Sequence, residues 1–340
     1  MYCEVIYIKI IVDAFGGDFS PNNVLKGASL AKKEHKNLEI ILCGNKQTLK
    51  TNASKIGVDL NCFTILDAKN YISTKENPNE IIDKNKESSM AIGLKTLNSP
   101  EIDAFITAGN TGALAVGSFF FNKKIKGVKR AALCVNVPSY KGNFLLLDAG
   151  ANLNCREDVL LQFALMGDIY SNKIFKIQKP RIGLANVGAE QTKGPKTHQG
   201  AYELLKHKTN LNFIGNVEAR YIPMGACDVV VCDGFSGNMI LKSLEGTAKF
   251  LIAMLKDAYS KNILTKIAAA ILTKQNKELK EKLNYKNYGG AILLGMEKPI
   301  IKTHGNSDEK TIKKAIDTTI NFINNNIVSE ITKNINILNI

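Results

Sequence analysis

Asp228-Val-Val-Val-Cys-Asp233-Gly-Phe-Ser-Gly-Asn238 is the stretch that decides the fold class. Three consecutive valines between small or acidic residues predict a buried strand, and the apolar segment that starts at Met239 predicts a helix. The glycines between them let backbone approach a ligand, and the first N–H groups of a helix favour an anion. An ordinary strand–turn–helix connection has the same pattern, so this stretch alone leaves both interpretations open.

Strand-like and helix-like runs alternate along most of the chain. The predicted strands cover residues 8–13, 38–43, 63–67, 104–107, 144–148, 182–186, 212–214 and 229–232. The predicted helices cover residues 22–36, 47–56, 90–97, 113–120, 156–170, 197–207 and 239–261. Near-continuous apolar strands separated by helices are typical of a parallel sheet that is covered on both faces. The sequence therefore predicts an α/β protein.

Five of the predicted strands end in a turn that combines glycine with Asn, Asp or Thr. These turns contain Gly16-Gly17, Gly109-Asn110-Thr111-Gly112, Gly150-Ala-Asn152, Gly188 with Lys193-Gly194, and Asp233-Gly234 with Gly237-Asn238. Ligands of open α/β sheets bind at the carboxyl ends of the strands. Because the combination recurs at five such ends, we expect one polar, glycine-rich cleft.

Several familiar site motifs are absent from the sequence. It contains neither GxxxxGK[ST] nor GxGxxG, which weighs against a P-loop NTPase and a dinucleotide-dependent dehydrogenase. It also lacks a GxSxG elbow, and none of its seven cysteines lies in a glycine-rich turn near a histidine. The four histidines have no ligand spacing to a cysteine, so we expect no metal and no cofactor. A covalent Ser or Cys nucleophile is not expected either.

The net charge and the number of cysteines indicate which binding partners and which cellular compartment to expect. The formal net charge is +14, but the lysines are scattered and no RRM, KH or zinc-finger signature occurs, so nucleic acid is not expected. An acidic protein or an anionic membrane surface fits better. An odd number of cysteines without CxxC indicates reduced thiols in the cytoplasm. No run approaches the ~20 apolar residues of a membrane span, and residues 1–8 read as an N-terminal extension without a cleavage site.

Eight blocks of sequence, in order over roughly residues 9–320, resemble the PlsX family, the phosphate acyltransferases of bacterial phospholipid synthesis. They are Val12-Asp-Ala-Phe-Gly-Gly-Asp18, Glu87-Ser-Ser-Met90, Ala108-Gly-Asn-Thr-Gly-Ala113, Leu147-Asp-Ala-Gly-Ala-Asn152, Gln162-Phe-Ala-Leu-Met-Gly167, Gly215-Asn-Val-Glu218, Asp233-Gly-Phe-Ser-Gly-Asn238 and Lys302-Thr-His-Gly305. The departures are Phe15, Ala189, Ala219 and Tyr221. Tyr221 stands where the family has Asp, which puts a catalytic role for that acid in doubt.

The resemblance implies a fold and a reaction. The fold is a three-layer α/β/α Rossmann-like sheet, similar to phosphotransacetylases and isocitrate-dehydrogenase-like folds, in one catalytic domain over residues 9–330. The reaction converts an acyl carrier protein thioester and inorganic phosphate to acyl phosphate and free carrier protein. The resemblance also implies a homodimer and peripheral attachment to the cytoplasmic membrane.

This reaction needs few reactive side chains. Phosphate is already an anionic nucleophile, so the site must align it with the thioester carbonyl and stabilise the oxyanion. The predicted catalytic residues are Asn110, Lys242 and His304. The predicted phosphate- and substrate-binding residues are Gly16, Gly17, Thr111, Gly112, Asn152, Lys193, Asp233, Gly234, Gly237 and Asn238. Structural roles remain as alternatives, since Asn110 or Thr111 suits a helix cap and both lysines suit a solvated surface.

The region from about residue 250 to 285 predicts a protruding helical arm. Ile263, Leu264, Ile267 and Ile271 lie there among lysines, as in a helix that rests on an anionic bilayer. A helix hairpin that packs in a dimer is the alternative. Two other functions also stay open: a phosphotransacetylase-like enzyme with an acyl-CoA donor, and a non-catalytic basic protein that binds membranes or nucleic acid.

Overall fold

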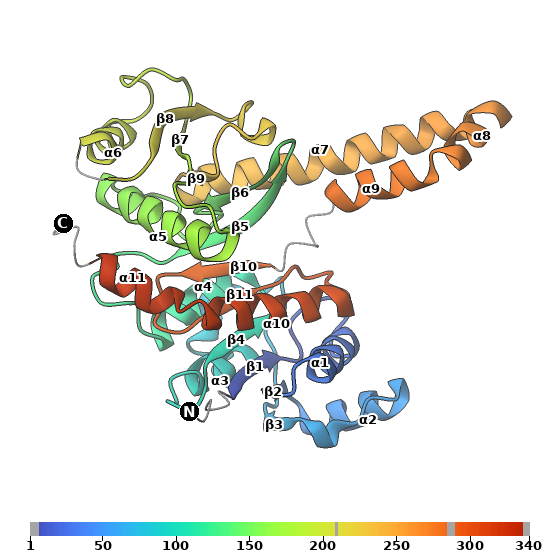
Figure 1. The fold of residues 1–340 in the computed structure, drawn as a ribbon. Helices are drawn as coiled ribbons and strands as arrows, with labels where there is room; N and C mark the ends of the chain where they lie inside the picture. Colours follow the sequence, from blue (N-terminus) through green and yellow to red (C-terminus); the bar gives the residue numbers. More distant parts are fainter. Residues whose placement is uncertain (1–6, 208–209, 284–289, 336–340) are drawn as a thin grey trace, which may run out of the picture.

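The core of the protein is one sheet between two layers of helices (Figure 1). The computed structural model describes residues 7–207, 210–283 and 290–335. Within these ranges eleven strands pair in the order β3-β2-β1-β4-β11-β10-β5-β6-β9-β7-β8. Their bounds are β1 Ile8–Asp13, β2 Leu38–Gly44, β3 Thr64–Asp67, β4 Ala104–Thr107, β5 Ala132–Ser139, β6 Gly142–Leu147, β7 Ile182–Asn186, β8 Phe213–Glu218, β9 Val229–Val231, β10 Ala291–Leu294 and β11 Ile300–Lys302.

Helices cover both faces of the sheet, which confirms the three-layer α/β/α arrangement. One face packs against α1 (Asn22–Glu34), α2 (Lys46–Ile56), α5 (Glu157–Phe175), α6 (Lys196–His207), α10 (Glu309–Asn324) and α11 (Ile327–Ile335). The other face packs against α3 (Ser89–Thr96), α4 (Thr111–Phe121) and the start of α7 (Gly234–Ser260). Successive residues of each strand enter opposite cores, as the period of two in a strand requires.

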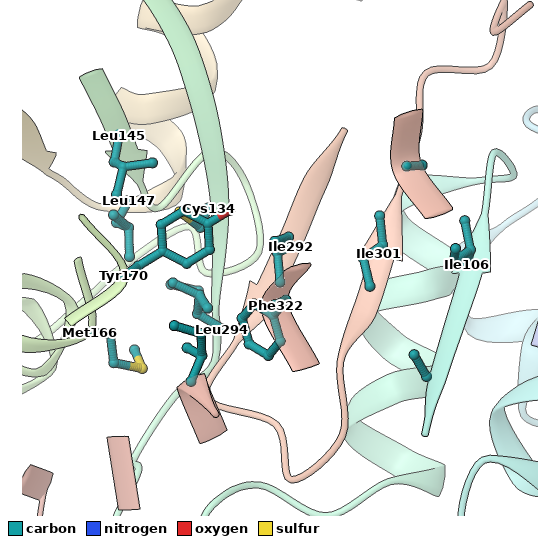
Figure 2. Packing of buried hydrophobic residues seen from close by; sticks show 14 of the residues in the cluster. Ile106, Cys134, Leu145, Leu147, Met166, Tyr170, Ile292, Leu294, Ile301 and Phe322 are labelled. Carbon is teal, nitrogen blue, oxygen red and sulfur yellow. The ribbon is translucent and has the colours of Figure 1, made fainter. Parts of the chain in front are cut away.

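The α5 and α10 side of the core packs small and branched side chains against aromatic rings of the two helices. Figure 2 shows Cys134 of β5 and Ile292 of β10 on this side, with Tyr170 of α5 and Phe322 of α10 packed near them. The rings of Tyr170 and Phe322 lie 6.2 Å apart between centroids. This contact joins the two helices across the middle of the sheet.

The sheet is mixed, which corrects the prediction of a parallel sheet. β5 pairs antiparallel with both β6 and β10, and β10 pairs antiparallel with β11. The cause is local, because β5 and β6 are joined by two residues, Tyr140 and Lys141, and so short a link permits only an antiparallel pair. β5 and β10 were absent from the predicted strands, and they are the strands that reverse the direction.

The reversal divides the five glycine turns into two groups. β1 and β4 run in one direction, whereas β6, β7 and β9 run in the other. The carboxyl ends of the two groups of strands therefore point in opposite directions, so the five turns do not stand at equivalent positions of the sheet. The prediction of five equivalent strand ends was wrong for this reason.

Two predicted boundaries also move. α7 begins at Gly234, not at Met239, because the Asp233 carboxylate accepts a hydrogen bond from the Ser236 N–H and caps the helix. α7 projects from the domain with α8 (Ile263–Ile271) and α9 (Thr273–Leu283) as the expected arm (Figure 1). β1 begins at Ile8, so the predicted extension of residues 1–8 overlaps the sheet, and residues 1–6 lie outside the described ranges.

Candidate functional site

The first group of glycine turns follows β1, β4 and β11, where three backbone segments nearly touch. A Cβ on Gly16 would lie 2.6 Å from the Gly109 nitrogen, and a Cβ on Gly17 would lie 2.8 Å from the Gly305 oxygen. Gly17 also has a φ of +105°, which side chains rarely adopt. Only glycine fits at these two positions, so their role in the structure is close packing of the three turns.

The side chain of Asp13, the last residue of β1, joins the turns of this first group through hydrogen bonds. Its buried carboxylate accepts hydrogen bonds from Ser89 Oγ at 2.6 Å, from Thr107 Oγ1 at 2.7 Å and from the Phe15 N–H at 3.2 Å. Burial raises the pKa of Asp13, and these hydrogen bonds oppose the increase. The carboxylate therefore shapes the turn by fixing its backbone and the two neighbouring hydroxyl groups.

The second group follows β6 and β9 and is organised by Asp148. The Asp148 carboxylate accepts hydrogen bonds from the backbone N–H groups of Leu133, Gly150, Ala151 and Asn152, at 2.7–3.1 Å, and from the Asn152 side chain at 2.8 Å. Burial raises the pKa of Asp148, and the donors oppose this. The turn after β6 is thereby fixed against the start of β5.

Two glycines of α7 let that helix begin directly against this turn. The Gly234 N–H donates to the Asn152 oxygen at 2.7 Å, and a Cβ on Gly237 would lie 1.9 Å from the Asp148 oxygen. Gly150 in turn lies beside Asn238, so a Cβ there would be 3.7 Å from the Asn238 Cβ. The second group therefore sets the position of the first two turns of α7.

A cavity of ≈150 Å³ lies between α4, α7 and the paired strands β5, β10 and β11. Its lining residues are Thr111, Leu133, Val135, Asn136, Val137, Ala149, Asn238, Leu241, Lys242, Glu245, Gly290, Ala291, Lys302, Thr303, His304 and Thr311. Most charged and polar groups come from the start of α4, from α7 and from the end of β11, whereas the β5 side is apolar apart from Asn136. The cavity therefore combines a cationic wall with an apolar wall, and we name it the basic cavity.

Lys302 is a residue of the basic cavity that the sequence prediction missed. It is the last residue of β11 and is only 8% exposed, and its Nζ donates to the Ala108 oxygen at 3.2 Å and to the Thr303 oxygen. Burial, followed by the charge of Lys242, lowers the pKa of Lys302 to about 8, against the opposing pull of Asp13. A lysine at the end of the apolar run Ile300-Ile301 was the signal that could have found it.

Lys242 and His304 reach the same cavity from different elements. The Lys242 Nζ lies 2.9 Å from Glu245 Oε2, one helical turn further along α7, so its charge is partly balanced. His304 Nδ1 accepts a hydrogen bond from the Asn306 N–H at 3.5 Å, a contact in which Nε2 is the ring nitrogen that carries a proton. The structure thus brings two of the three predicted catalytic residues together.

Asn110, the third predicted catalytic residue, does not line the cavity. Its side-chain oxygen accepts from the Ala113 N–H at 3.0 Å and caps α4, while its Nδ2 donates to the oxygens of Ser73 and Glu76, both at 3.1 Å. The whole carboxamide is thereby used inside the protein. This geometry favours the capping alternative, and direct contact of Asn110 with a substrate remains a prediction.

The predicted binding residues separate into two sets. Thr111 and Asn238 line the basic cavity. Gly16, Gly17, Gly112, Asn152, Asp233, Gly234 and Gly237 do not, and they instead hold the backbone around the cavity. Lys193 is exposed on the turn after β7, where its backbone oxygen accepts from Asn186 Nδ2 at 3.1 Å. The binding roles of this second set remain predictions.

One group of potential metal ligands occurs in the described part of the chain. Glu34, His35 and Asp317 place their ligand atoms within 4.8 Å of one another on the outside of α1 and α10. Lys313 Nζ already lies 2.7 Å from Glu34 and 2.8 Å from Asp317. The group is therefore a surface ion-pair cluster whose negative charge is balanced by a lysine.

Comparison with known proteins places this chain in a family. The model of a family described as fatty acid synthesis protein matches residues 8–330. The phosphate acyltransferase of Caldanaerobacter subterraneus subsp. tengcongensis is 45% identical over 328 residues, which are 96% of this chain and 97% of that protein. The phosphate acyltransferase of Thermoanaerobacter pseudethanolicus is 44% identical over equal shares.

Solved structures with low sequence identity share the fold of this chain. A phosphotransacetylase from Streptococcus pyogenes superposes with a TM-score of 0.60 at 17% identity, over 94% of this chain and 95% of that one. The EutD phosphotransacetylase from Staphylococcus aureus gives a TM-score of 0.57 at 12% identity, over 92% and 93%. With its sequence relatives and this fold, the chain belongs to the PlsX family of fatty acid synthesis proteins and is an acyltransferase.

Proposed function

We propose that this protein transfers an acyl group from the thioester of acyl carrier protein to inorganic phosphate. The products are acyl phosphate and the free thiol of the carrier protein, and the acyl phosphate serves phospholipid synthesis. The observation that carries the proposal is the basic cavity, where Lys242, Lys302 and His304 face an apolar wall. The names of the relatives support the choice of phosphate as acceptor.

Phosphate has a natural position in this cavity. Thr111, which lines the cavity, is the first residue of α4, where N–H groups lack helical partners and the helix dipole favours an anion. Lys302 supplies a buried positive charge from the neighbouring end of β11, where its Nζ lies 3.2 Å from the Ala108 oxygen, and Lys242 of α7 supplies a second, more exposed one. An anion between them would relieve the repulsion between the two ammonium groups.

The reaction step needs positioning more than acid or base catalysis. An oxygen of HPO₄²⁻ attacks the thioester carbon, a C–O bond forms, and the carbonyl electrons move onto oxygen. The carbonyl then re-forms as the C–S bond breaks, and the proton of the phosphate ends on the thiolate. Asn238 and His304 Nε2–H are the donors we assign to the oxyanion and the departing sulfur.

The direct test is product formation from defined donors. Palmitoyl carrier protein is incubated with the enzyme, with and without phosphate, and acyl phosphate and carrier thiol are measured by mass spectrometry. The proposal expects both products in equal amounts only when phosphate is present. A parallel reaction with palmitoyl-CoA separates the donors, and efficient transfer from CoA alone would replace carrier protein with CoA as the donor.

The arm supports the proposed membrane attachment and dimer. Ile263, Leu264, Ile267 and Ile271 of α8 are 54–75% exposed in the single chain, beside exposed lysines. No helix in the described ranges is long and apolar enough to cross a bilayer. We propose a cytoplasmic protein whose exposed α8 face rests on an anionic membrane surface or packs against a second copy of the chain.

Liposome flotation and light scattering test the arm. The double variant Ile267→Glu with Ile271→Glu should lose flotation with anionic liposomes. Gln275→Glu with Lys277→Gln on exposed α9 changes the net charge by the same two units and serves as the matched charge control. A double variant that stays dimeric but no longer floats supports the membrane surface. One that becomes monomeric assigns the apolar face to the dimer, and undiminished flotation rejects the membrane role.

A further inference from the structure

The segment between α4 and β5 concentrates positive charge. Of the eight residues from Lys123 to Arg130, five are lysine or arginine, whereas the whole chain has 45 such residues among 340. Lys123, Lys124, Lys126 and Arg130 are exposed. We name residues 123–130 the basic loop.

The two apolar residues of the basic loop fix it to the core. Ile125 and Val128 are 3% and 5% exposed, and the Val128 N–H donates to the Ile125 oxygen at 2.9 Å. The buried side chain of Gln162 on α5 donates to the Gly127 oxygen at 2.9 Å and accepts from the Lys129 N–H at 2.8 Å. The backbone that carries the exposed cations is therefore ordered before any partner binds, which lowers the entropy cost of binding.

Acidic residues of the chain balance little of this charge. Lys129 Nζ pairs with Asp158 of α5. Lys123, Lys126 and Arg130 form no ion pair within the described part of the chain. The loop thus presents unpaired positive charge at the surface, and an acidic protein surface is the complementary partner.

The basic loop lies next to one end of the basic cavity. Leu133 of β5, which lines the cavity, is only three residues beyond Arg130. The turn after β6 adjoins the same place, because Asn152 Nδ2 donates to the Ala131 oxygen at 2.7 Å and Ala149 lines the cavity. Three residues of extended chain span about 10 Å. A carrier protein bound at the loop would therefore hold its thioester-bearing arm close to the cavity.

A protein partner fits the basic loop better than a bilayer does. Elements that lie on a membrane turn apolar side chains outward among their cations, as Ile267 and Ile271 of α8 do. In the basic loop the two apolar side chains are buried, and the exposed side chains are cations. The loop and α8 therefore suit different partners.

We propose that the basic loop docks the acyl carrier protein through acidic side chains of that protein. This inference rests on the proposed function, which supplies the carrier protein as donor, and adds the surface of this chain that binds it. The charges of the loop lie outside the cavity, so docking sets the affinity for the carrier protein and leaves the step at the phosphate unchanged. The affinity should fall as salt screens these charges.

Charge reversal of two exposed lysines tests the docking surface. In Lys123→Glu with Lys126→Glu we expect the KM for palmitoyl carrier protein to rise at least about tenfold at low salt, while kcat and the KM for phosphate stay unchanged. The matched control is Lys50→Glu with Lys55→Glu on exposed positions of α2, which changes the net charge by the same four units. Lys123→Gln with Lys126→Gln should give a smaller rise and replaces the reversal if that variant folds poorly.

The outcomes separate the docking surface from the proposed function. An unchanged KM for palmitoyl carrier protein in the folded loop variants overturns the inference, and so does an equal rise in the α2 control. Loss of liposome flotation with an unchanged carrier-protein KM assigns the loop to the membrane instead. In each of these cases the wild-type enzyme still forms acyl phosphate, whereas a wild-type enzyme that forms none overturns the proposed function.

Discussion

Lys302 of β11 and Lys242 of α7 line one cavity, where burial and then the Lys242 charge lower the pKa of Lys302 to about 8. Two cations that face one small space repel each other until an anion enters it. The repulsion between the two ammonium groups raises the energy of the site without an anion, and phosphate binding relieves it. It links a strand and a helix that lie 60 positions apart in the sequence.

Removal of either cation should weaken phosphate binding. Charge-assisted hydrogen bonds contribute about 1.5–3 kcal/mol, so Lys302→Met should raise the KM for phosphate by roughly 10- to 100-fold. Lys242→Met should have a smaller effect because Lys242 is half exposed and paired with Glu245. Steady-state kinetics with varied phosphate provide the measurement, with exposed Lys249→Met of α7 as control. Normal phosphate KM values in both site variants would remove these lysines from the site.

The low pKa of Lys302 predicts a pH dependence of phosphate binding. Lys302 is protonated below about pH 8 and loses its proton as the pH rises through that value, so the KM for phosphate should increase above pH 8. The Lys302→Met variant should lack this increase. Kinetics between pH 7 and pH 9.5 check it, and an identical rise in the variant would assign the titration to another group.

The lowered pKa of Lys302 also affects the stability of the fold. Phosphate binding weakens as the pH rises, whereas the free energy of unfolding increases. The unfolded chain keeps the Lys302 proton up to about pH 10.4, whereas the folded chain releases it near pH 8. The unfolded state therefore binds more protons in this window, and the contribution of Lys302 to the free energy of unfolding rises with pH there. Urea unfolding of wild type and Lys302→Met at pH 7.5 and 9.5 should show this difference.

Substitution of Asn110 distinguishes a cap from a catalytic group. Asn110→Ala removes the α4 cap and the two hydrogen bonds to the 73–76 loop, so the free energy of unfolding should fall by about 2 kcal/mol. Asn110→Ser keeps a capping oxygen and should lose less. Urea unfolding measures both variants. A drop in kcat of at least ~100-fold with unchanged stability would instead assign Asn110 to catalysis.

Two glycines of α7 form a matched pair. Gly237→Ala would bring a methyl group against the Asp148 oxygen, so we expect a loss of about 1–3 kcal/mol in the free energy of unfolding. Gly246→Ala meets no atom within 4 Å and should stabilise the helix by about 1 kcal/mol. Thermal unfolding compares the two. Equal effects would mean that α7 is not fixed against the turn after β6.

The sequence was sufficient for most single elements and insufficient for their arrangement. The apolar runs at β1, β4, β7 and β9 have the length and composition of buried strands, so they were predicted within one residue. β5 was missed because Asn136 and Pro138 interrupt its apolar pattern. Without β5 and β10, the reversal of strand direction was invisible, and the glycine turns were grouped at one edge.

The sequence predicted only part of the site, because the burial of a side chain depends on the fold. Thr111, Asn238, Lys242 and His304 come from two helices and a loop that the family blocks mark, and they do meet at one cavity. Lys302 was missed because a lysine within an apolar strand reads as a residue whose charge points to solvent. Only the fold shows that its ammonium group is buried beside Ala108.

The central claim is that phosphate itself becomes part of the product. The most direct measurement incubates palmitoyl carrier protein with ¹⁸O-labelled phosphate and follows the label by mass spectrometry. We predict palmitoyl phosphate that retains the ¹⁸O label, with one carrier thiol released for each molecule formed and a rate that falls in Lys302→Met. Phosphate-independent release of unlabelled free palmitate, at the same rate in the variant, would contradict the account.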